Sequence, residues 1–125
     1  MKGRSSVSHG EKEIVTRTYA FSLRVVKMCQ TIGRNSIGNI FLKQVLRSGT
    51  SIGANVEEAQ GGHSKKDFIA KIQIGYKEAR ETHYWLRLMR DSAIVAPEKM
   101  DEIIQECEQI AKVLASILFS AKQNN

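Results

Sequence analysis

An apolar stripe near the end of the chain is the feature that most constrains the fold. Its members recur in steps of three and four, with three more on the same side: Met100, Ile103, Cys107, Ile110, Leu114, Ile117 and Ala121, then Ile104, Ala111 and Leu118. This spacing places apolar side chains on one face of an α-helix, and such a face has to be buried against other elements. No segment shows sustained alternation with a period of two, so no β-strand is expected. The chain is therefore expected to be all-α.

Capping residues divide the rest of the chain into further helices. Gly33 suits the C-terminal cap of a first helix, and either Asn35 or Ser36 can cap the start of a second. Ser64 begins a pattern that resembles a capping box at the start of a third helix, and Pro97 suits the first position of a fourth. The helices are expected at 11–33, 36–61, 64–92 and 97–122.

The expected connections between these helices are only a few residues long. Helices joined so closely lie antiparallel beside one another, so the expected architecture is an up-down-up-down four-helix bundle. The chain has 125 residues, of which 42% are hydrophobic, enough for one domain over 11–122 without metal or disulfide staples. Residues 1–10 are mostly small and polar and are expected to form a flexible tail.

The two cysteines and the N-terminal residues indicate the cellular compartment in which the protein is expected. Cys29 and Cys107 lie on apolar stripes far apart in the chain, so they form either one bridge or, as we favour, two buried reduced thiols. No apolar segment of the signal-peptide type follows Met1, and the most apolar uncharged run, 113–121, is too short to span a bilayer. These features predict a cytoplasmic protein without a membrane partner.

The first helix is apolar around an unusually large part of its circumference. One stripe contains Val15, Tyr19, Leu23, Val26 and Cys29. A second stripe contains Ile14, Phe21, Val25, Met28 and Ile32. Together they cover roughly 220°, whereas a simple amphipathic helix has an apolar arc of about 100–140°. The excess predicts a subunit interface, which we assign to the second stripe; the alternative is a helix packed more centrally than usual.

Glycine recurs inside the second and third helices, at Gly49, Gly53 and Gly75, where each costs about 1 kcal/mol relative to alanine. Counting back from the turn between these helices places Gly49 level with Tyr76, so we expect the glycines to let the two helices approach closely. The string GTSIG at 49–53 also matches the G-x-S-x-G nucleophile elbow. That motif needs a preceding strand, and a phosphate-binding loop needs a following G-K-[ST], so neither is expected here.

Titratable residues do not gather as they do in active sites or metal centres. His9, His63 and His83 are scattered, and His83 lies on the inner side of the third helix, where a satisfied interior or interface histidine is expected. The adjacent Glu57 and Glu58 point about 100° apart on a helix, so they do not converge. No H-E-x-x-H or E-x-x-H string is present. No catalytic, metal or cofactor-binding residue is predicted, which indicates a non-enzymatic protein.

Positive charge is concentrated before the last helix. The chain has 19 basic and 13 acidic residues, a net charge of +6, and residues 1–96 hold 16 of the basic and 8 of the acidic ones. Opposite the inner face of the third helix lies a set of polar residues that we call the basic stripe: Lys66, Gln73, Lys77, Arg80, Tyr84 and Arg87. Cations interleaved with an amide and a ring can follow a phosphate backbone, and Lys43 and Arg47 are further candidates. The alternative is a solvated face whose cations pair with Glu78 and Glu81.

Three segments together resemble a known family: SGTSIGANVEEA at 48–59, SKKDF at 64–68 and KEARETHYWLRL at 77–88. The family is that of the 23S rRNA intervening-sequence proteins, and the resemblance extends over about 19–121. It implies a four-helix bundle that assembles into a ring-like homopentamer. The genes of this family occur within insertions in bacterial 23S rRNA genes and elsewhere in bacterial genomes. The family supplies no established catalytic residues, and its matched Trp85 implies a helix-end or subunit contact.

The accessory proteins of diversity-generating retroelements look like relatives of this family. They form basic pentameric barrels that bind nucleic acid and a reverse transcriptase, so a reverse transcriptase is a candidate partner by family analogy alone. We therefore expect a non-enzymatic homo-oligomer that binds RNA or DNA through a basic surface repeated by symmetry. The alternative is a self-assembling scaffold or adaptor for a protein partner, whose charge serves solubility.

Overall fold

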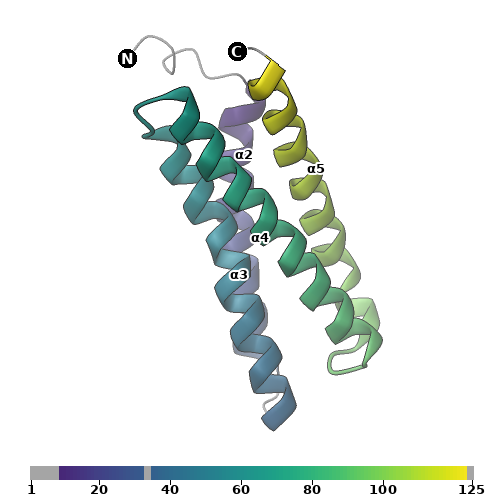
Figure 1. Ribbon diagram of the computed structural model, residues 1–125. Coiled ribbons are helices and arrows are strands. Elements are labelled where there is room, and N and C mark those ends of the chain that lie inside the picture. The colour runs from purple at the N-terminus through teal and green to yellow at the C-terminus, as the bar shows by residue number, and fades with distance from the viewer. Residues whose placement is uncertain (1–8, 33–34, 124–125) are drawn as a thin grey trace.

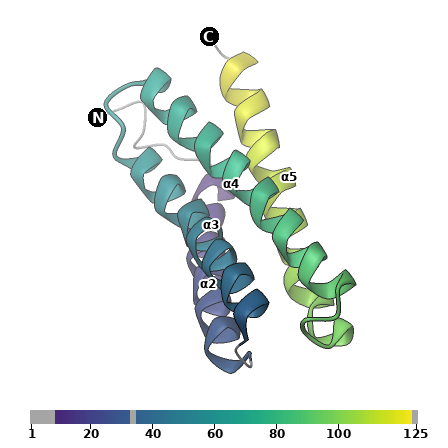
Figure 2. The same cartoon turned by 60° about the horizontal axis from the view of Figure 1, so that its bottom comes forward.

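Four long helices make up the part of the chain that the structure, a computed structural model, describes: residues 9–32 and 35–123 (Figure 1). They are α2 (His9–Thr31), α3 (Ser36–Gln60), α4 (Lys65–Asp91) and α5 (Asp101–Gln123), with the short 3-10 helix η1 (Pro97–Lys99) before the last. Consecutive helices contact one another and α2 also contacts α5, so the four close into an up-down bundle (Figure 2). The predicted all-α four-helix fold is confirmed.

Side-chain caps fix where α3 and α4 begin. Asn35 Oδ1 accepts a hydrogen bond from the Gly38 amide at 2.7 Å, so Asn35 is the N-terminal cap of α3. Ser64 Oγ accepts one from the Asp67 amide at 3.1 Å and caps α4 as its sequence pattern predicts. Gly33, the predicted cap of the first helix, and residues 1–8 of the predicted tail lie outside the described residues.

Two helices begin differently from the prediction. The first helix starts at His9, inside the segment expected to be a tail, rather than at residue 11. The last is divided, because Pro97 opens η1, which closes with a hydrogen bond from the Met100 amide to the Pro97 carbonyl at 3.0 Å, and α5 begins only at Asp101. Proline suits the first turn of either kind of helix, since its missing N–H would have no intrahelical partner there. Pro97, which the sequence analysis placed at the start of the fourth helix, is therefore the first residue of η1 and not of α5.

The core is built from the apolar faces of all four helices. Val25 of α2, Ile52 of α3, Ile72 of α4 and Ile110 of α5 are completely buried. Burying each such side chain contributes roughly 1.5–3 kcal/mol, so this common core is the main source of stability. Within the described residues, no helix is both long enough and apolar enough to cross a membrane.

The two cysteines are not joined in a disulfide. Cys107 lies in the core, where its Sγ is 3.4 Å from the Ala79 carbonyl oxygen, and burial raises the pKa of its thiol to about 12. Cys29 is half-buried where α2 contacts α3, with its Sγ 3.9 Å from the Leu42 carbonyl oxygen. Because a thiol with so high a pKa stays protonated at neutral pH, Cys107 behaves as an apolar core residue.

Two of the three glycines named from the sequence face α2, and only Gly75 lies at the predicted contact between α3 and α4. A Cβ added to Gly49 would lie 3.0 Å from Val25 Cγ2, and one added to Gly53 would lie 3.1 Å from the Thr18 carbonyl oxygen, so both glycines admit α2 and not α4. A Cβ on Gly75 would lie 3.6 Å from the Ile52 carbonyl oxygen of α3, which is an ordinary contact. The prediction that Gly49 lets α3 approach α4 is therefore wrong, because counting from a turn fixes height along a helix but not the rotation about its axis.

Candidate nucleic-acid interface

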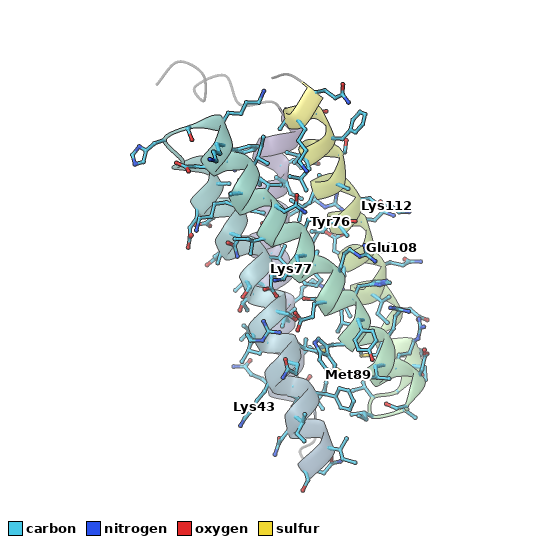
Figure 3. The ribbon with its side chains drawn as sticks, in the orientation of Figure 1. Lys43, Tyr76, Lys77, Met89, Glu108 and Lys112 are labelled. Atoms are coloured by element: carbon cyan, nitrogen blue, oxygen red, sulfur yellow. The ribbon has the colours of Figure 1, made fainter. Side chains whose placement is uncertain are left out.

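The basic stripe lies on the solvent side of α4. All six members are exposed: Lys66, Gln73, Lys77, Arg80, Tyr84 and Arg87. They are held there because Phe68, Ile72, Ala79 and Leu86 bury the opposite face of the helix in the core. In Figure 3 the side chain of Lys77 projects from the outer surface of α4. The helix therefore presents these polar groups along one continuous side.

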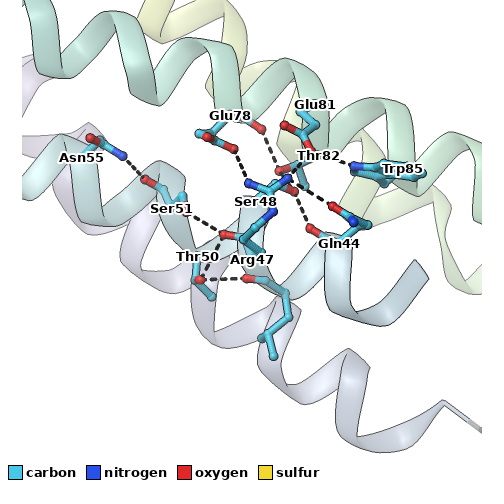
Figure 4. Close-up of polar contacts among 11 residues, drawn as sticks. Gln44, Arg47, Ser48, Thr50, Ser51, Asn55, Glu78, Glu81, Thr82 and Trp85 are labelled. Carbon is cyan, nitrogen blue, oxygen red and sulfur yellow. Dashed lines mark hydrogen bonds and ion pairs between the residues drawn. The ribbon is translucent and has the colours of Figure 1, made fainter. Parts of the chain in front are cut away.

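Arg47 of α3 does not join this surface, because acidic side chains of α4 already hold it. Its guanidinium lies 3.4 Å from Glu78 Oε1, forms a short ion pair with Glu81 Oε2, and donates to Gln44 Oε1 at 3.2 Å (Figure 4). Glu81 Oε2 also accepts a hydrogen bond from Trp85 Nε1 at 3.0 Å. The sequence prediction of Arg47 as a phosphate ligand is thus replaced by a structural role as a tie between α3 and α4.

Lys43 is exposed on α3, but the structure does not bring it to the basic stripe. Its side chain points away from α4 in Figure 3, one helical turn from Arg47. The acidic partners of Arg47 also lie between α3 and the exposed side of α4. Lys43 is therefore a separate surface cation, whereas the predicted cations of α4 share one face.

Two lysines of α5 extend the basic stripe across the helix boundary. Lys122 Nζ donates to Gln73 Oε1 at 3.3 Å, and Lys112 faces Arg80 and Arg87 across a groove. Sequence reasoning missed both, because α5 and the turn before it carry more acidic than basic residues. On a helical projection of α5, Lys112 shares a face with Glu108, so the sequence of this helix alone does not single it out.

Two acidic residues of α5 are directed toward α2, whereas Asp101 pairs with Arg90 of α4 and Glu108 lines the space between α4 and α5. Glu106 accepts two hydrogen bonds from Arg17, at 3.0 Å to Nε and 2.8 Å to the terminal nitrogen, and Arg24 lies 3.8 Å from Glu102. The two bonds from Arg17 raise the pKa of that guanidinium further. On the side of α5 that faces α4, Lys112 shares the helix face with Glu108, four residues before it.

A groove about 250 Å³ in volume runs between α4 and α5. We call it the α4–α5 groove, and it is lined by Tyr76, Arg80, His83, Arg87, Glu108, Ala111, Lys112 and Ala115. It exists because the two alanines of α5 are too short to fill the space beside the larger side chains of α4. Figure 3 shows Tyr76, Glu108 and Lys112 along this seam. The groove places cations of two helices around one hollow.

His83 is half-buried in this groove, between α4 and α5. Burial lowers its pKa below the ordinary 6.5, the positive charges of Arg87 and Arg90 lower it further, and Glu108 acts in the opposite direction. The imidazole is therefore neutral at pH 7. It provides a polar group in the groove without adding charge.

The predicted subunit-interface residues of the first helix are mainly core residues of the monomer. Ile14, Phe21 and Val25 are at most 1% exposed, and Met28 and Ile32 are partly buried against the core. Assigning this stripe to an interface was wrong, because α3 and α5 bury it within one chain. An arc wide enough for two stripes does not reveal which of them the neighbouring helices will cover.

The other stripe of α2 is the one that faces solvent. Tyr19 is 58% exposed and Leu23 is 54% exposed, and Val26 and Leu46 of α3 are also open large apolar side chains. We call these residues the α2–α3 apolar face. Trp85, the remaining predicted interface residue, is half-buried on α4 with its ring edge-on to Phe41 at 5.9 Å.

Fold and surface together define a class: a small four-helix bundle with a cationic face on its third and fourth helices. The chain belongs to the 23S rRNA-intervening sequence protein family, whose model matches residues 11–116. It is also similar to a crystal structure at 1.70 Å of a protein of unknown function from the S23 ribosomal protein family of Bacteroides thetaiotaomicron. The two chains are 36% identical, with a TM-score of 0.81, over 87% of this chain and 97% of that one. No curated protein matches the sequence significantly.

Proposed function

We propose that this protein is a non-enzymatic, self-associating bundle that binds RNA or DNA through the basic stripe. One observation carries the proposal. Among the described residues, the cations of the stripe, Lys66, Lys77, Arg80 and Arg87, have no carboxylate within ion-pair distance, and two acids of the same helix are paired with Arg47. Glu78 and Glu81 are occupied by Arg47, so the face keeps its positive charge. Cations on such a face release the counterions condensed on a nucleic acid when they neutralise its phosphates, so the affinity they contribute falls as salt rises.

Self-association would multiply this charge. A ring of identical chains repeats the basic stripe at each subunit, and each additional neutralised phosphate adds to the binding free energy. The α2–α3 apolar face supports self-association, because large apolar side chains exposed to solvent favour contact with another protein surface. It lies on different helices from the basic stripe, so the two surfaces do not compete.

The test compares two charge-matched double variants. We expect Lys77→Glu with Arg80→Glu to lower affinity for a labelled RNA or DNA at least about tenfold at roughly 50 mM salt, and to reduce the slope of log K against log salt by about two. Lys27→Glu with Lys43→Glu changes the total charge equally but alters exposed positions of α2 and α3. That control should retain most of the affinity. A fragment of 23S rRNA is the first RNA to measure, since the family's name contains that molecule.

Three results would decide the matter. A selective loss in the α4 variant supports the proposal. An equal loss in both variants would show that total charge, and not the basic stripe, governs binding. No retention of RNA or DNA by the wild-type protein at about 50 mM salt would favour the alternative, a scaffold for a protein partner.

A further inference from the structure

The α4–α5 groove differs from the basic stripe in two respects: it is hollow, and side chains of two helices line it. We propose that it holds one nucleotide of a single strand, with the phosphate beside Arg87 and Lys112 and the base on the pair formed by Tyr76 and Arg80. This inference rests on the proposed function and names the form of nucleic acid that the surface prefers. Single-stranded RNA and DNA share the chemistry, and duplex is the competing ligand.

The charge around the groove favours a phosphate. Arg80 and Arg87 of α4 and Lys112 of α5 line it, and within the described part of the chain none of the three has a carboxylate within ion-pair distance. Glu108 is the acidic residue in the lining, and His83 is neutral at pH 7. Cations therefore outnumber the acid in a hollow that partly excludes water, where charge-assisted hydrogen bonds to a phosphate are stronger than on an open surface.

A flat platform lies beside these cations. The Arg80 guanidinium carbon is 5.9 Å from the centre of the Tyr76 ring, so the cation is held over the ring face. Tyr76 and Arg80 also line a second hollow with Gln73, Ile74 and Lys77. Tyr76 and Arg80 therefore lie between the two hollows and line both of them. A guanidinium plane supported by a ring accepts a stacked base, and its outer nitrogens remain able to donate to phosphate.

This geometry discriminates against a duplex. Paired and stacked bases expose only their edges, so a double helix can place its phosphates along the outer side of α4 but has no free base face for Tyr76 and Arg80. An unpaired strand can bring a phosphate into the groove and lay the adjoining base on the Tyr76–Arg80 pair. We therefore expect tighter binding of a single strand than of a duplex of the same length.

The experiment measures binding of fluorescently labelled oligo(U), oligo(dT) and a duplex of the same length to the full chain. Tyr76→Leu keeps an apolar side chain against the core but removes the ring, and it should lower single-strand affinity at least about fivefold while leaving duplex affinity nearly unchanged. Tyr76→Phe should restore the preference, because the ring is retained. Phe119→Leu is the matched control, since it removes an exposed ring from α5 that does not line the groove.

Lys112→Gln keeps the test independent of folding, because Lys112 is exposed and its replacement cannot leave a cavity. It should weaken single-strand binding more than duplex binding. Equal affinity of the wild type for the strand and the duplex, or no effect of either Tyr76→Leu or Lys112→Gln, would overturn the inference. If Lys77→Glu with Arg80→Glu still abolished binding in that case, the proposed function would stand without this groove; no binding of any probe would instead remove the proposed function itself.

Discussion

Three glycines in the interiors of helices have different reasons to be glycine. At Gly53 the nearest neighbour of an added Cβ would be the Thr18 carbonyl of the α2 backbone, which cannot move without displacing the helix. At Gly49 the neighbour would be the side chain of Val25, which has some freedom to adjust. At Gly75 the space already accommodates a methyl group. An added Cβ therefore meets close atoms where α3 packs on α2, and only atoms at ordinary contact distance where α4 packs on α3.

A matched pair of alanine variants tests this distinction. We expect Gly53→Ala to lower the free energy of unfolding by about 1–3 kcal/mol, because the added methyl group forces α2 and α3 apart. Gly75→Ala should raise it by about 0.5–1 kcal/mol, because alanine has the higher helix propensity and meets no close atom. Chemical denaturation followed by circular dichroism measures both values. Stabilisation by both substitutions would mean that α2 does not approach Gly53 so closely.

At the scale of the helices, a buried hydroxyl pair joins α3 to α4. Thr82 Oγ1 lies 2.8 Å from both Ser48 Oγ and the Glu78 carbonyl oxygen, and Ser48 Oγ donates to the Gln44 carbonyl at 2.9 Å. Neither side chain has measurable exposure. Each hydroxyl can be satisfied within its own helix, so the bond between them fixes the alignment of the two helices beyond what apolar packing requires.

A double-mutant cycle isolates this bond. Thr82→Val keeps the shape of the side chain and should cost about 1 kcal/mol of unfolding free energy, as should Ser48→Ala. Once one partner is absent, the second substitution should cost less, giving a coupling energy of about 1 kcal/mol. Urea denaturation of the four proteins supplies the cycle. Strictly additive losses would show that each hydroxyl serves only its own helix.

Sequence patterns predicted the helices well but not their rotations. The stripe on α5 lies largely in the core, and Asn35 and Ser64 start their helices, because periodicity and capping are local properties. The burial of Phe21 and the neighbours of Gly49 depend on which side of a helix meets its partners. That choice is made by the packing of four helices together, so a single helix carries little information about it.

For the candidate site, the exposure of the residues was predictable from the sequence, but their contacts with other helices were not. Every member of the basic stripe is exposed as expected, since a helix with one buried face leaves the opposite face in solvent. Arg47 was misassigned because its acidic partners lie on another helix. Lys112 was missed because acidic residues outnumber the lysines of α5, and because only the packing of α5 against α4 places it in one lining with Arg80 and Arg87. Contacts between helices, and not residue types, decide which cations stay available.

At the scale of the whole molecule, the α2–α3 apolar face bears on assembly. If it is a subunit contact, Leu23→Glu should convert an oligomer into monomers, because burying an unpaired carboxylate costs several kcal/mol. The fold should survive, since Leu23 is more than half exposed in the single chain. Sedimentation equilibrium at several concentrations gives the mass, and Ala20→Glu, at another exposed position of α2, is the control. An unchanged mass for Leu23→Glu would place any assembly contact elsewhere.

The position of Trp85 gives the molecule a built-in optical reporter. It is the chain's only tryptophan. Its ring lies edge-on to Tyr84 of the basic stripe at 5.3 Å, and its indole nitrogen donates to the carboxylate that also holds Arg47. Light absorbed by Tyr84 can therefore pass to a single emitter whose spectrum responds to the local field. Ligand contact with α4 and separation of α3 from α4 would both alter that emission, so either event can be followed in unlabelled protein.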